Sequence, residues 1–223
     1  MNAIKPLRID VFSDVVCPWC YIGKKRLEAA MDLAADVPVE LHWHPFFLQP
    51  DLPREGVERT AFITARFGSP EAYEARSQQV VATAEAEGLS YRPDLIRRQP
   101  NTLDSHRLIR WAAGDPAGDR SGPVKQRLME LFFREGGDIG DAGVLAQAAA
   151  DCGMDGEDVR RRLATDEDVE TVSSQALSAS RRGISGVPTF IFAAKYAASG
   201  AQPADLLARA IREISAELND AAE

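Results

Sequence analysis

The segment DVVCPWC (residues 14–20) places two cysteines two residues apart, where one kind of local structure gives way to another. Residues 7–12 alternate apolar and polar side chains almost throughout, which is typical of a β-strand with one buried face. Pro18 is favoured at the first position of a helix, and apolar residues then recur at helical spacing. The sequence therefore predicts a strand-to-helix turn, with Cys17 directly before the helix.

Four further segments extend this pattern. Residues 37–44 alternate again and predict a second strand, which completes a β-α-β unit. Near the C-terminus, residues 189–192 and 195–199 predict two short strands, followed by an amphipathic helix that begins at Pro203. The order β-α-β, then β-β-α, is that of a thioredoxin fold.

A long helical block interrupts this order. Its start and stop signals and its apolar spacing are those of helices throughout residues 51–182. We therefore predict an α/β protein, a thioredoxin fold with a large all-helical insertion domain. The core is expected to consist of residues 1–50 and 183–223, and the insertion of residues 51–182.

Composition limits the function. The net charge of -8 and the pI near 5.0 argue against nucleic acid or an anionic membrane as a partner. The first seven residues lack the apolar stretch of a secretory signal, so a cytoplasmic protein is expected. Three cysteines are too few for a disulfide scaffold, and a cytoplasmic C-x-x-C pair is more often catalytic or metal-binding.

The position of Cys17 suggests redox chemistry. A cysteine at a helix start meets unpaired N–H groups and the positive end of the helix dipole, which favour the thiolate. We expect the Cys17 sulfur to accept hydrogen bonds from the N–H of Trp19 or Cys20, with Lys24, Lys25 and Arg26 adding positive potential. Cys20 lies one helical turn on, so Cys17 is predicted to attack a disulfide and Cys20 to resolve the mixed disulfide.

The segment GISGVPTFIF (residues 183–192) is the second candidate element of the site. A proline just before a strand cannot donate to the sheet and often follows a cis bond. The backbone of Val187, before Pro188, is then free to pair with an extended substrate.

These motifs resemble the DsbA-like branch of the thioredoxin superfamily. SDVVCPWC, the helical block, GVPTFIF and YAASGAQP are similar to FrnE-type proteins, which are related to 2-hydroxychromene-2-carboxylate isomerases and kappa-class glutathione transferases. The resemblance implies that Cys17 is the nucleophile, that Cys20 resolves, and that the Val187–Pro188 bond is cis and faces the pair. It also implies that His106 lies in a stretch lining the cavity over the active site.

The chain departs from this family in three ways. No cysteine follows Pro203, whereas some FrnE-type proteins have a second pair in a C-terminal tail. Ala193 and Ala194 stand where such a hairpin usually has Asn-Gly or Asp-Gly, so we expect a different or strained turn. The glutathione-using isomerases have a serine at the nucleophile position, and Cys17 favours dithiol chemistry instead.

The remaining cysteine, histidine and aspartate residues have other expected roles. Half of a zinc site is the alternative for the cysteine pair, but few further ligands remain, and no metal is predicted. Cys152 is expected to pack on a helix's apolar face, and His42 and His44 to form a polar strand face. Asp14 either takes a proton from Cys20 or ends the strand, and His106 is either a cavity residue or a structural histidine.

The sequence thus predicts a thiol–disulfide oxidoreductase or isomerase. Cys17 and Cys20 are the predicted catalytic residues, and Pro18, Trp19, Val187, Pro188 and His106 the predicted substrate-binding residues. A protein or small-molecule disulfide or dithiol is the expected partner. We predict no cofactor, although glutathione is a possible co-substrate, and a homodimer is also left open. Two alternative functions remain. One is a glutathione-dependent isomerase or transferase acting on a small aromatic substrate, and the other is a non-catalytic binding or chaperone module.

Overall fold

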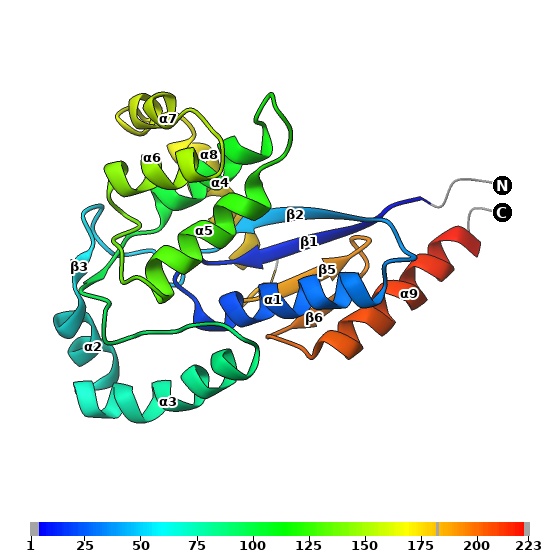
Figure 1. The fold of residues 1–223 in the computed structure, drawn as a ribbon, viewed down its shortest axis with the longest axis horizontal. Coiled ribbons are helices and arrows are strands. Elements are labelled where there is room, and N and C mark those ends of the chain that lie inside the picture. Colours follow the sequence, from blue (N-terminus) through cyan, green and yellow to red (C-terminus); the bar gives the residue numbers. More distant parts are fainter. Residues whose placement is uncertain (1–4, 182, 221–223) are drawn as a thin grey trace.

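The computed structural model describes residues 5–181 and 183–220 and has a sheet flanked by helices, with a helical region at one end (Figure 1). The sheet contains β1 (Leu7–Ser13), β2 (Val39–Pro45), β5 (Thr189–Phe192) and β6 (Tyr196–Ser199). Their spatial order is β2-β1-β5-β6, with β1 parallel to β2 and antiparallel to β5. The predicted thioredoxin fold is confirmed.

Two helices pack on one face of this sheet. They are α1 (Pro18–Leu33), which connects the parallel strands, and α9 (Ala204–Asp220). Alternate strand residues point at them, and the resulting core is fully apolar: Leu7, Ile9, Val11, Leu27, Phe190, Phe192, Leu207 and Ile211 are all buried. The later part of α1 belongs to this core through Leu27 and Ala30, whereas Cys20, Tyr21 and Ile22 of its first turns pack with the helical region.

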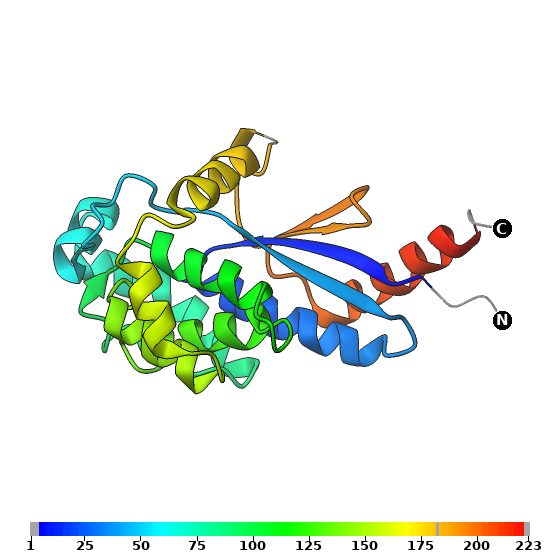
Figure 2. The same cartoon turned by 90° about the horizontal axis from the view of Figure 1, so that it is seen from above.

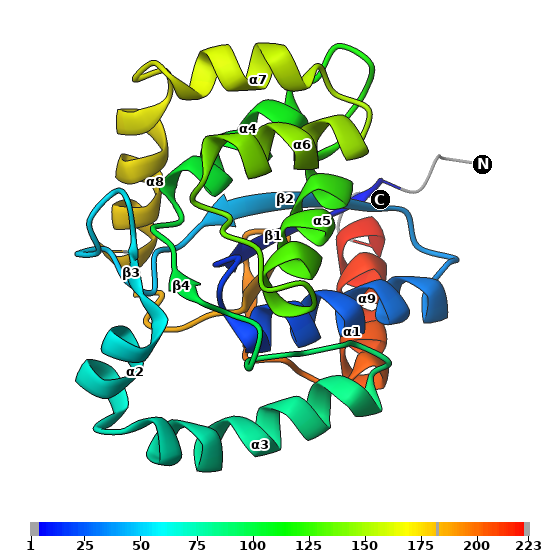
Figure 3. The same ribbon diagram turned by 60° about the vertical axis from the view of Figure 1, so that its left-hand side comes forward.

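The region between β2 and β5 is mainly helical, as predicted. It contains α2 (Arg59–Phe67), α3 (Pro70–Ala86), α4 (Leu103–Ala113), α5 (Ser121–Phe133), α6 (Ala142–Asp151), α7 (Gly156–Leu163) and α8 (Val169–Arg181). Figure 3 shows α2 and α3 set apart from the group formed by α4 to α8. None of the helices within the described residues has the length and hydropathy needed to cross a bilayer. The predicted domain boundaries stay a prediction, and residue 182 lies outside the described residues.

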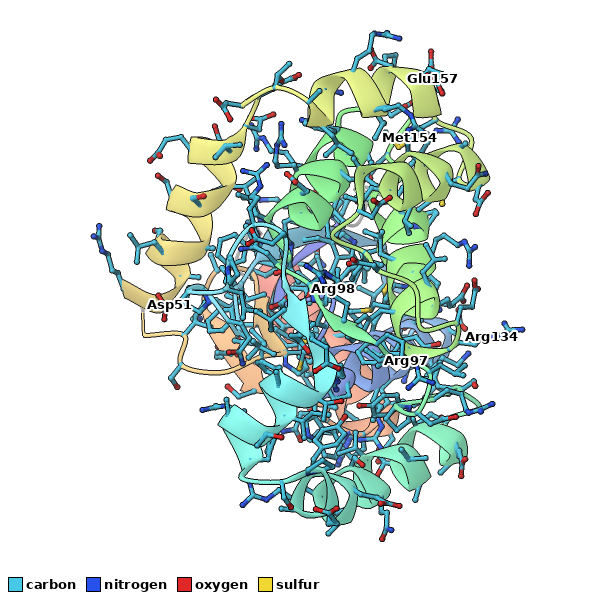
Figure 4. The ribbon with its side chains drawn as sticks, turned by 90° about the vertical axis from the view of Figure 1, so that its left-hand side faces the viewer. Asp51, Arg97, Arg98, Arg134, Met154 and Glu157 are labelled. Atoms are coloured by element: carbon cyan, nitrogen blue, oxygen red, sulfur yellow. The ribbon has the colours of Figure 1, made fainter. Side chains whose placement is uncertain are left out.

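A short two-stranded ladder, not predicted from the sequence, joins the two helical groups. β3 (Val57–Glu58) pairs antiparallel with β4 (Arg98–Gln99). The Arg98 side chain donates to the carbonyls of Glu55 (2.7 Å) and Gly56 (3.3 Å), and Figure 4 labels it in this end of the molecule. Strands of two residues are too short to produce an alternating pattern, which is why the sequence predicted helices alone.

The opposite face of the sheet is covered differently. Helix α8 and helix α1 lie on opposite sides of β1 and β2 (Figure 2). Ala179 of α8 packs with Phe12, Phe46 and Ile184. His44 on this face stacks on Phe12 and its Nε2 lies 2.6 Å from Oδ1 of Asp10. The predicted polar strand face is therefore present beside α8.

The turn between β5 and β6 is strained, as the departure from Asn-Gly suggested. Ala193 and Ala194 both have positive φ, 52° and 56°, and the N–H of Lys195 donates to the Phe192 carbonyl at 3.0 Å. Positive φ at both central residues is the feature of type I′ turns, which match the twist of the two strands. An alanine in this region is less stable than a glycine because its Cβ crowds the next carbonyl.

We predict that Ala194→Gly raises the free energy of unfolding by about 1 kcal/mol, because it removes this steric cost at one residue. Urea unfolding of the reduced protein measures the change. The matched control is Ala197→Gly in β6, where glycine only weakens a strand and stability is expected to fall. Equal effects at the two positions would show that the turn is not strained.

Candidate active site

The two cysteines lie at the start of α1, where the sequence placed them. Cys17 is the N-cap residue, with extended backbone, and Pro18 is the first helical residue. The Cys17 carbonyl accepts from the N–H groups of Cys20 (3.0 Å) and Tyr21 (3.1 Å), which fixes the first turn. Cys17 and Cys20 are both buried and unbonded to each other, while Trp19 is 37% exposed. The turn therefore presents an aromatic ring beside two sheltered thiols.

The Cys17 sulfur points toward the segment before β5. Its Sγ lies 3.7 Å from the Val187 carbonyl oxygen, a distance consistent with a weak S–H donation. The expected hydrogen bond to the Cys17 sulfur from Trp19 or Cys20 is absent, since no side-chain cap bond is present at this helix start. The Cys20 N–H donates instead to the Cys17 carbonyl and is already satisfied.

The Val187–Pro188 bond is cis, as the resemblance implied. The Pro188 ring packs against α1 at Gly23, where a Cβ would lie only 2.8 Å from Pro188 Cγ. Any larger residue at position 23 would push the proline segment away from the helix start. Close packing at Gly23 thus keeps the Val187 carbonyl beside the Cys17 sulfur.

Cys20 is shielded from solvent and holds its proton more tightly than a free cysteine. Burial raises the pKa of the Cys20 thiol well above its usual value, and the hydrogen bond and charge of Cys17 raise it further. The positive charge of Lys125 opposes this effect. The environment thus favours a pair in which Cys20 carries the proton.

Lys125 is a site residue that sequence reasoning missed. It belongs to α5, is 1% exposed and lies with its Nζ 5.2 Å from the centre of the Trp43 ring. Burial lowers the pKa of Lys125 to about 8, while the charges of Cys20 and Asp14 oppose the change. The sequence did contain a signal for it. Met129 and Phe132 follow four and seven residues later, so Lys125 shares the apolar face of its helix.

The cations expected near Cys17 are engaged elsewhere. Lys24 pairs with Glu28 on α1, and the Arg26 side chain bonds Glu87 at 2.7 Å and the Ala201 carbonyl at 2.6 Å. The charges of Lys24 and Arg26 are therefore compensated by Glu28 and Glu87, and their expected effect on the Cys17 sulfur stays a prediction.

Asp14 and His106 form a buried pair beside the site. His106 Nε2 lies 3.3 Å from Asp14 Oδ1, and the Leu48 N–H donates to Asp14 Oδ2 at 2.9 Å. Burial lowers the pKa of His106. His106 lines a cavity with His44 and Lys125, whereas Pro18 and Trp19 line a different cavity, so these three predicted substrate contacts do not share one cavity.

Metal ligands do not converge in the part of the chain that the structure describes, where no group of three or more His, Cys, Asp and Glu side chains could hold an ion. His42 Nε2 lies 4.0 Å from Glu40 Oε2, on the same strand face as His44. Cys152 caps the end of α6 and is half-buried against apolar neighbours.

A cavity of about 260 Å³ opens directly beside the cysteine turn. We call it the Trp19 cavity. Its walls come from the turn itself and from the helical region, and they are largely apolar: Pro18, Trp19, Phe62, Phe67, Val80 and Phe132. Pro18 and Trp19 line this cavity, whereas Val187, whose carbonyl oxygen lies beside the Cys17 sulfur, does not.

The site thus combines a thioredoxin fold, a C-P-W-C pair at a helix start and a cis proline whose preceding carbonyl lies beside Cys17. The chain matches the family described as DSBA-like thioredoxin domain over residues 8–212. It belongs to that family.

Solved structures show the same architecture. A probable DsbA oxidoreductase from Streptomyces coelicolor is 31% identical with a TM-score of 0.83, covering 95% of this chain and 91% of that one. A 2-hydroxychromene-2-carboxylate isomerase is 15% identical with a TM-score of 0.69, covering 97% and 100%. The cytosolic disulfide reductase DsbM from Pseudomonas aeruginosa, solved with glutathione, is 17% identical with a TM-score of 0.60, covering 96% and 98%. The last two show likeness of fold alone.

Proposed function

We propose that the protein is a thiol–disulfide oxidoreductase with Cys17 as nucleophile and Cys20 as resolving thiol. The observation that carries the proposal is the asymmetry of the pair. Both thiols are buried, but Cys17 is the N-cap residue beside Trp19 with its Sγ 3.7 Å from the Val187 carbonyl oxygen, whereas Cys20 lies within α1 and has a raised pKa. A dithiol enzyme needs this division between an attacking and a proton-holding sulfur.

The reaction proceeds in two balanced exchanges. The Cys17 thiolate attacks one sulfur of a substrate disulfide, which breaks the substrate S–S bond, forms a mixed disulfide and releases one substrate thiolate. Cys20 then loses its proton and attacks the Cys17 sulfur, which releases the second thiolate. Two electrons pass from the dithiol to the substrate, and the reverse sequence oxidises a substrate dithiol.

Lys125 supports the second exchange. Its positive charge lowers the pKa of Cys20 against the effect of burial, so it favours the thiolate that must form for resolution. Trp19 and Pro18 contact a substrate from the cavity side, and the backbone at Val187 contacts it from the side of β5. These roles are part of the proposal.

We place this activity in the cytoplasm, with glutathione as reductant or co-substrate. The support is the likeness to DsbM, which is described as a cytosolic disulfide reductase and was solved with glutathione. A reducing compartment favours disulfide reduction or isomerisation over oxidation.

A second candidate is a glutathione-dependent isomerase or transferase acting on a small aromatic compound. It is supported by the Trp19 cavity and by the shared fold of the 2-hydroxychromene-2-carboxylate isomerase. A binding or chaperone module is the third. Alkylating Cys17 after mild reduction separates them, because disulfide reduction is then lost in the first case while binding persists in the third.

A redox titration of the purified protein against reduced and oxidised glutathione tests the proposal. We expect a single two-electron transition, with thiol alkylation and mass spectrometry as the readout. This transition should disappear in Cys17→Ser. A midpoint below about -270 mV favours a reductase, and one above about -180 mV an oxidant or isomerase. The proposal is wrong if the wild-type protein forms no Cys17–Cys20 disulfide anywhere in the titration.

A further inference from the structure

The Trp19 cavity contains a buried positive charge that the redox mechanism does not use. Arg59, the first residue of α2, lines the cavity and is 9% exposed. Its backbone N–H donates to the Arg97 carbonyl at 3.0 Å, so the ladder of β3 and β4 holds it in place. A guanidinium is always charged, and enclosing it costs free energy unless an anion compensates.

No carboxylate within the described residues pairs with Arg59. One terminal nitrogen donates to the Gln99 side chain and the other to the Tyr73 hydroxyl at 2.8 Å, and both acceptors are neutral. The remaining Nε is buried and has no acceptor among the described residues. The guanidinium therefore keeps its charge beside the cavity, and one of its three nitrogens has no acceptor.

The charge around the cavity is the opposite of that of the whole protein. The chain has 34 acidic and 26 basic residues, yet the lining contains Arg59 and Arg76 and no Asp or Glu. The Arg76 guanidinium lies 5.8 Å from the centre of the Phe67 ring, an aromatic wall of the same cavity. The lining thus combines two arginines, which can bind a carboxylate, with aromatic rings, which can contact the apolar part of the same molecule, and it contains no acidic side chain to repel the carboxylate.

Two tyrosines link this charge to the reacting sulfur. The Tyr73 hydroxyl lies 2.8 Å from that of Tyr91, and burial, Tyr73 and, to a smaller extent, the charge of Cys17 raise the pKa of Tyr91. Tyr73 and Tyr91 both line the cavity, as does Trp19 beside Cys17. An anion held by Arg59 would thus place the rest of a small molecule toward the thiols.

We propose that the Trp19 cavity binds a small disulfide or thiol that carries a carboxylate next to an apolar group, with Arg59 as the carboxylate-binding residue. This rests on the proposed function, because the bound sulfur is taken to react with Cys17. A volume of about 260 Å³ suits part of a small molecule rather than a folded polypeptide. Arg59 is then a specificity-determining residue of the site.

Two chromogenic disulfides test the proposal by their charge. 5,5′-Dithiobis(2-nitrobenzoate) carries a carboxylate on each ring, and 4,4′-dithiodipyridine is a neutral aromatic disulfide. With either reagent, Cys17 displaces one aryl thiolate and Cys20 then displaces the second, so two electrons pass from the dithiol to the reagent. We expect Arg59→Met to slow the reaction with the dicarboxylate about tenfold or more and to change the dipyridine rate less than twofold.

Control variants separate charge from folding. Arg59→Lys keeps the charge and is expected to retain part of the dicarboxylate rate. Arg66→Met removes an exposed arginine from the same helix, outside the cavity lining, and should leave both rates unchanged. Equal losses with both reagents in Arg59→Met, or no loss with either, would overturn the role of Arg59.

A binding experiment keeps this inference separate from the redox proposal. In Cys17→Ser, calorimetry compares naphthalene-2-carboxylate with the neutral naphthalene-2-carboxamide. We expect the carboxylate to bind at least about tenfold more tightly, and Arg59→Met to remove the difference. If Cys17 proves unreactive but this preference holds, the redox function fails and the anion site stands. Equal affinity for the two compounds, or binding of neither, overturns the site itself.

Discussion

Replacing Cys17 with serine is expected to reduce disulfide exchange to background, a loss of at least about a thousandfold. The hydroxyl of serine is a far weaker nucleophile than a thiolate at neutral pH, and the other thiol of the site, Cys20, is buried within α1 with a raised pKa. The measurement is reduction of insulin by the protein with glutathione as donor. A variant that retains more than about a tenth of the wild-type rate would contradict the assigned nucleophile.

The other two cysteines provide the controls. Cys20→Ser is expected to stop turnover and to accumulate a mixed disulfide between Cys17 and substrate, visible by mass spectrometry. Cys152→Ser should keep nearly full activity, because Cys152 caps α6 and is not part of the site. A mixed disulfide trapped on Cys20 in Cys17→Ser, with none trapped on Cys17 in Cys20→Ser, would reverse the two roles.

Replacing Lys125 with methionine is expected to stabilise the reduced protein at pH 7. The pKa of Lys125 is about 8 in the fold against 10.5 for an ordinary lysine, a difference that corresponds to roughly 3 kcal/mol of destabilisation while the amine is charged. Below pH 8 the Lys125 amine is protonated in both the folded and the unfolded state, so the full destabilisation of the folded state applies. Methionine matches the shape of the side chain and removes the buried charge.

The sign of the pH dependence follows from proton binding. Between about pH 8 and 10.5 the unfolded wild-type chain binds more protons at Lys125 than the folded chain, so wild-type stability rises with pH relative to Lys125→Met. Urea unfolding at pH 7, 8.5 and 10 measures the difference, with the exposed Lys25→Met as control. A stability difference that is the same at all three pH values would show that Lys125 does not titrate in this window.

The same substitution should lower the midpoint potential of the Cys17–Cys20 pair. The Lys125 charge stabilises thiolate in the reduced form, and its removal favours the disulfide. A shift on the order of tens of millivolts to more negative values is expected. An unchanged potential with a changed stability would leave Lys125 a structural residue only.

Much of the fold could be predicted because its signals are local. The alternation in β1 and β2, the proline at the start of α1 and the apolar stripe of α9 each follow from neighbouring residues. The two-residue ladder of β3 and β4 could not be predicted, since a strand that short has no period of its own. The strained turn at Ala193 and Ala194 was expected, because hairpin geometry constrains two adjacent residues.

The candidate site divides in the same way. The spacing of Cys17 and Cys20 and the proline between them are properties of one helical turn, so the sequence alone determined the dithiol and its place at a helix start. Only the tertiary structure decided what surrounds the sulfurs: Val187 from 170 residues away, Lys125 from α5 and Arg59 from α2. Burial and electrostatics depend on distance in space, and packing between remote segments sets that distance.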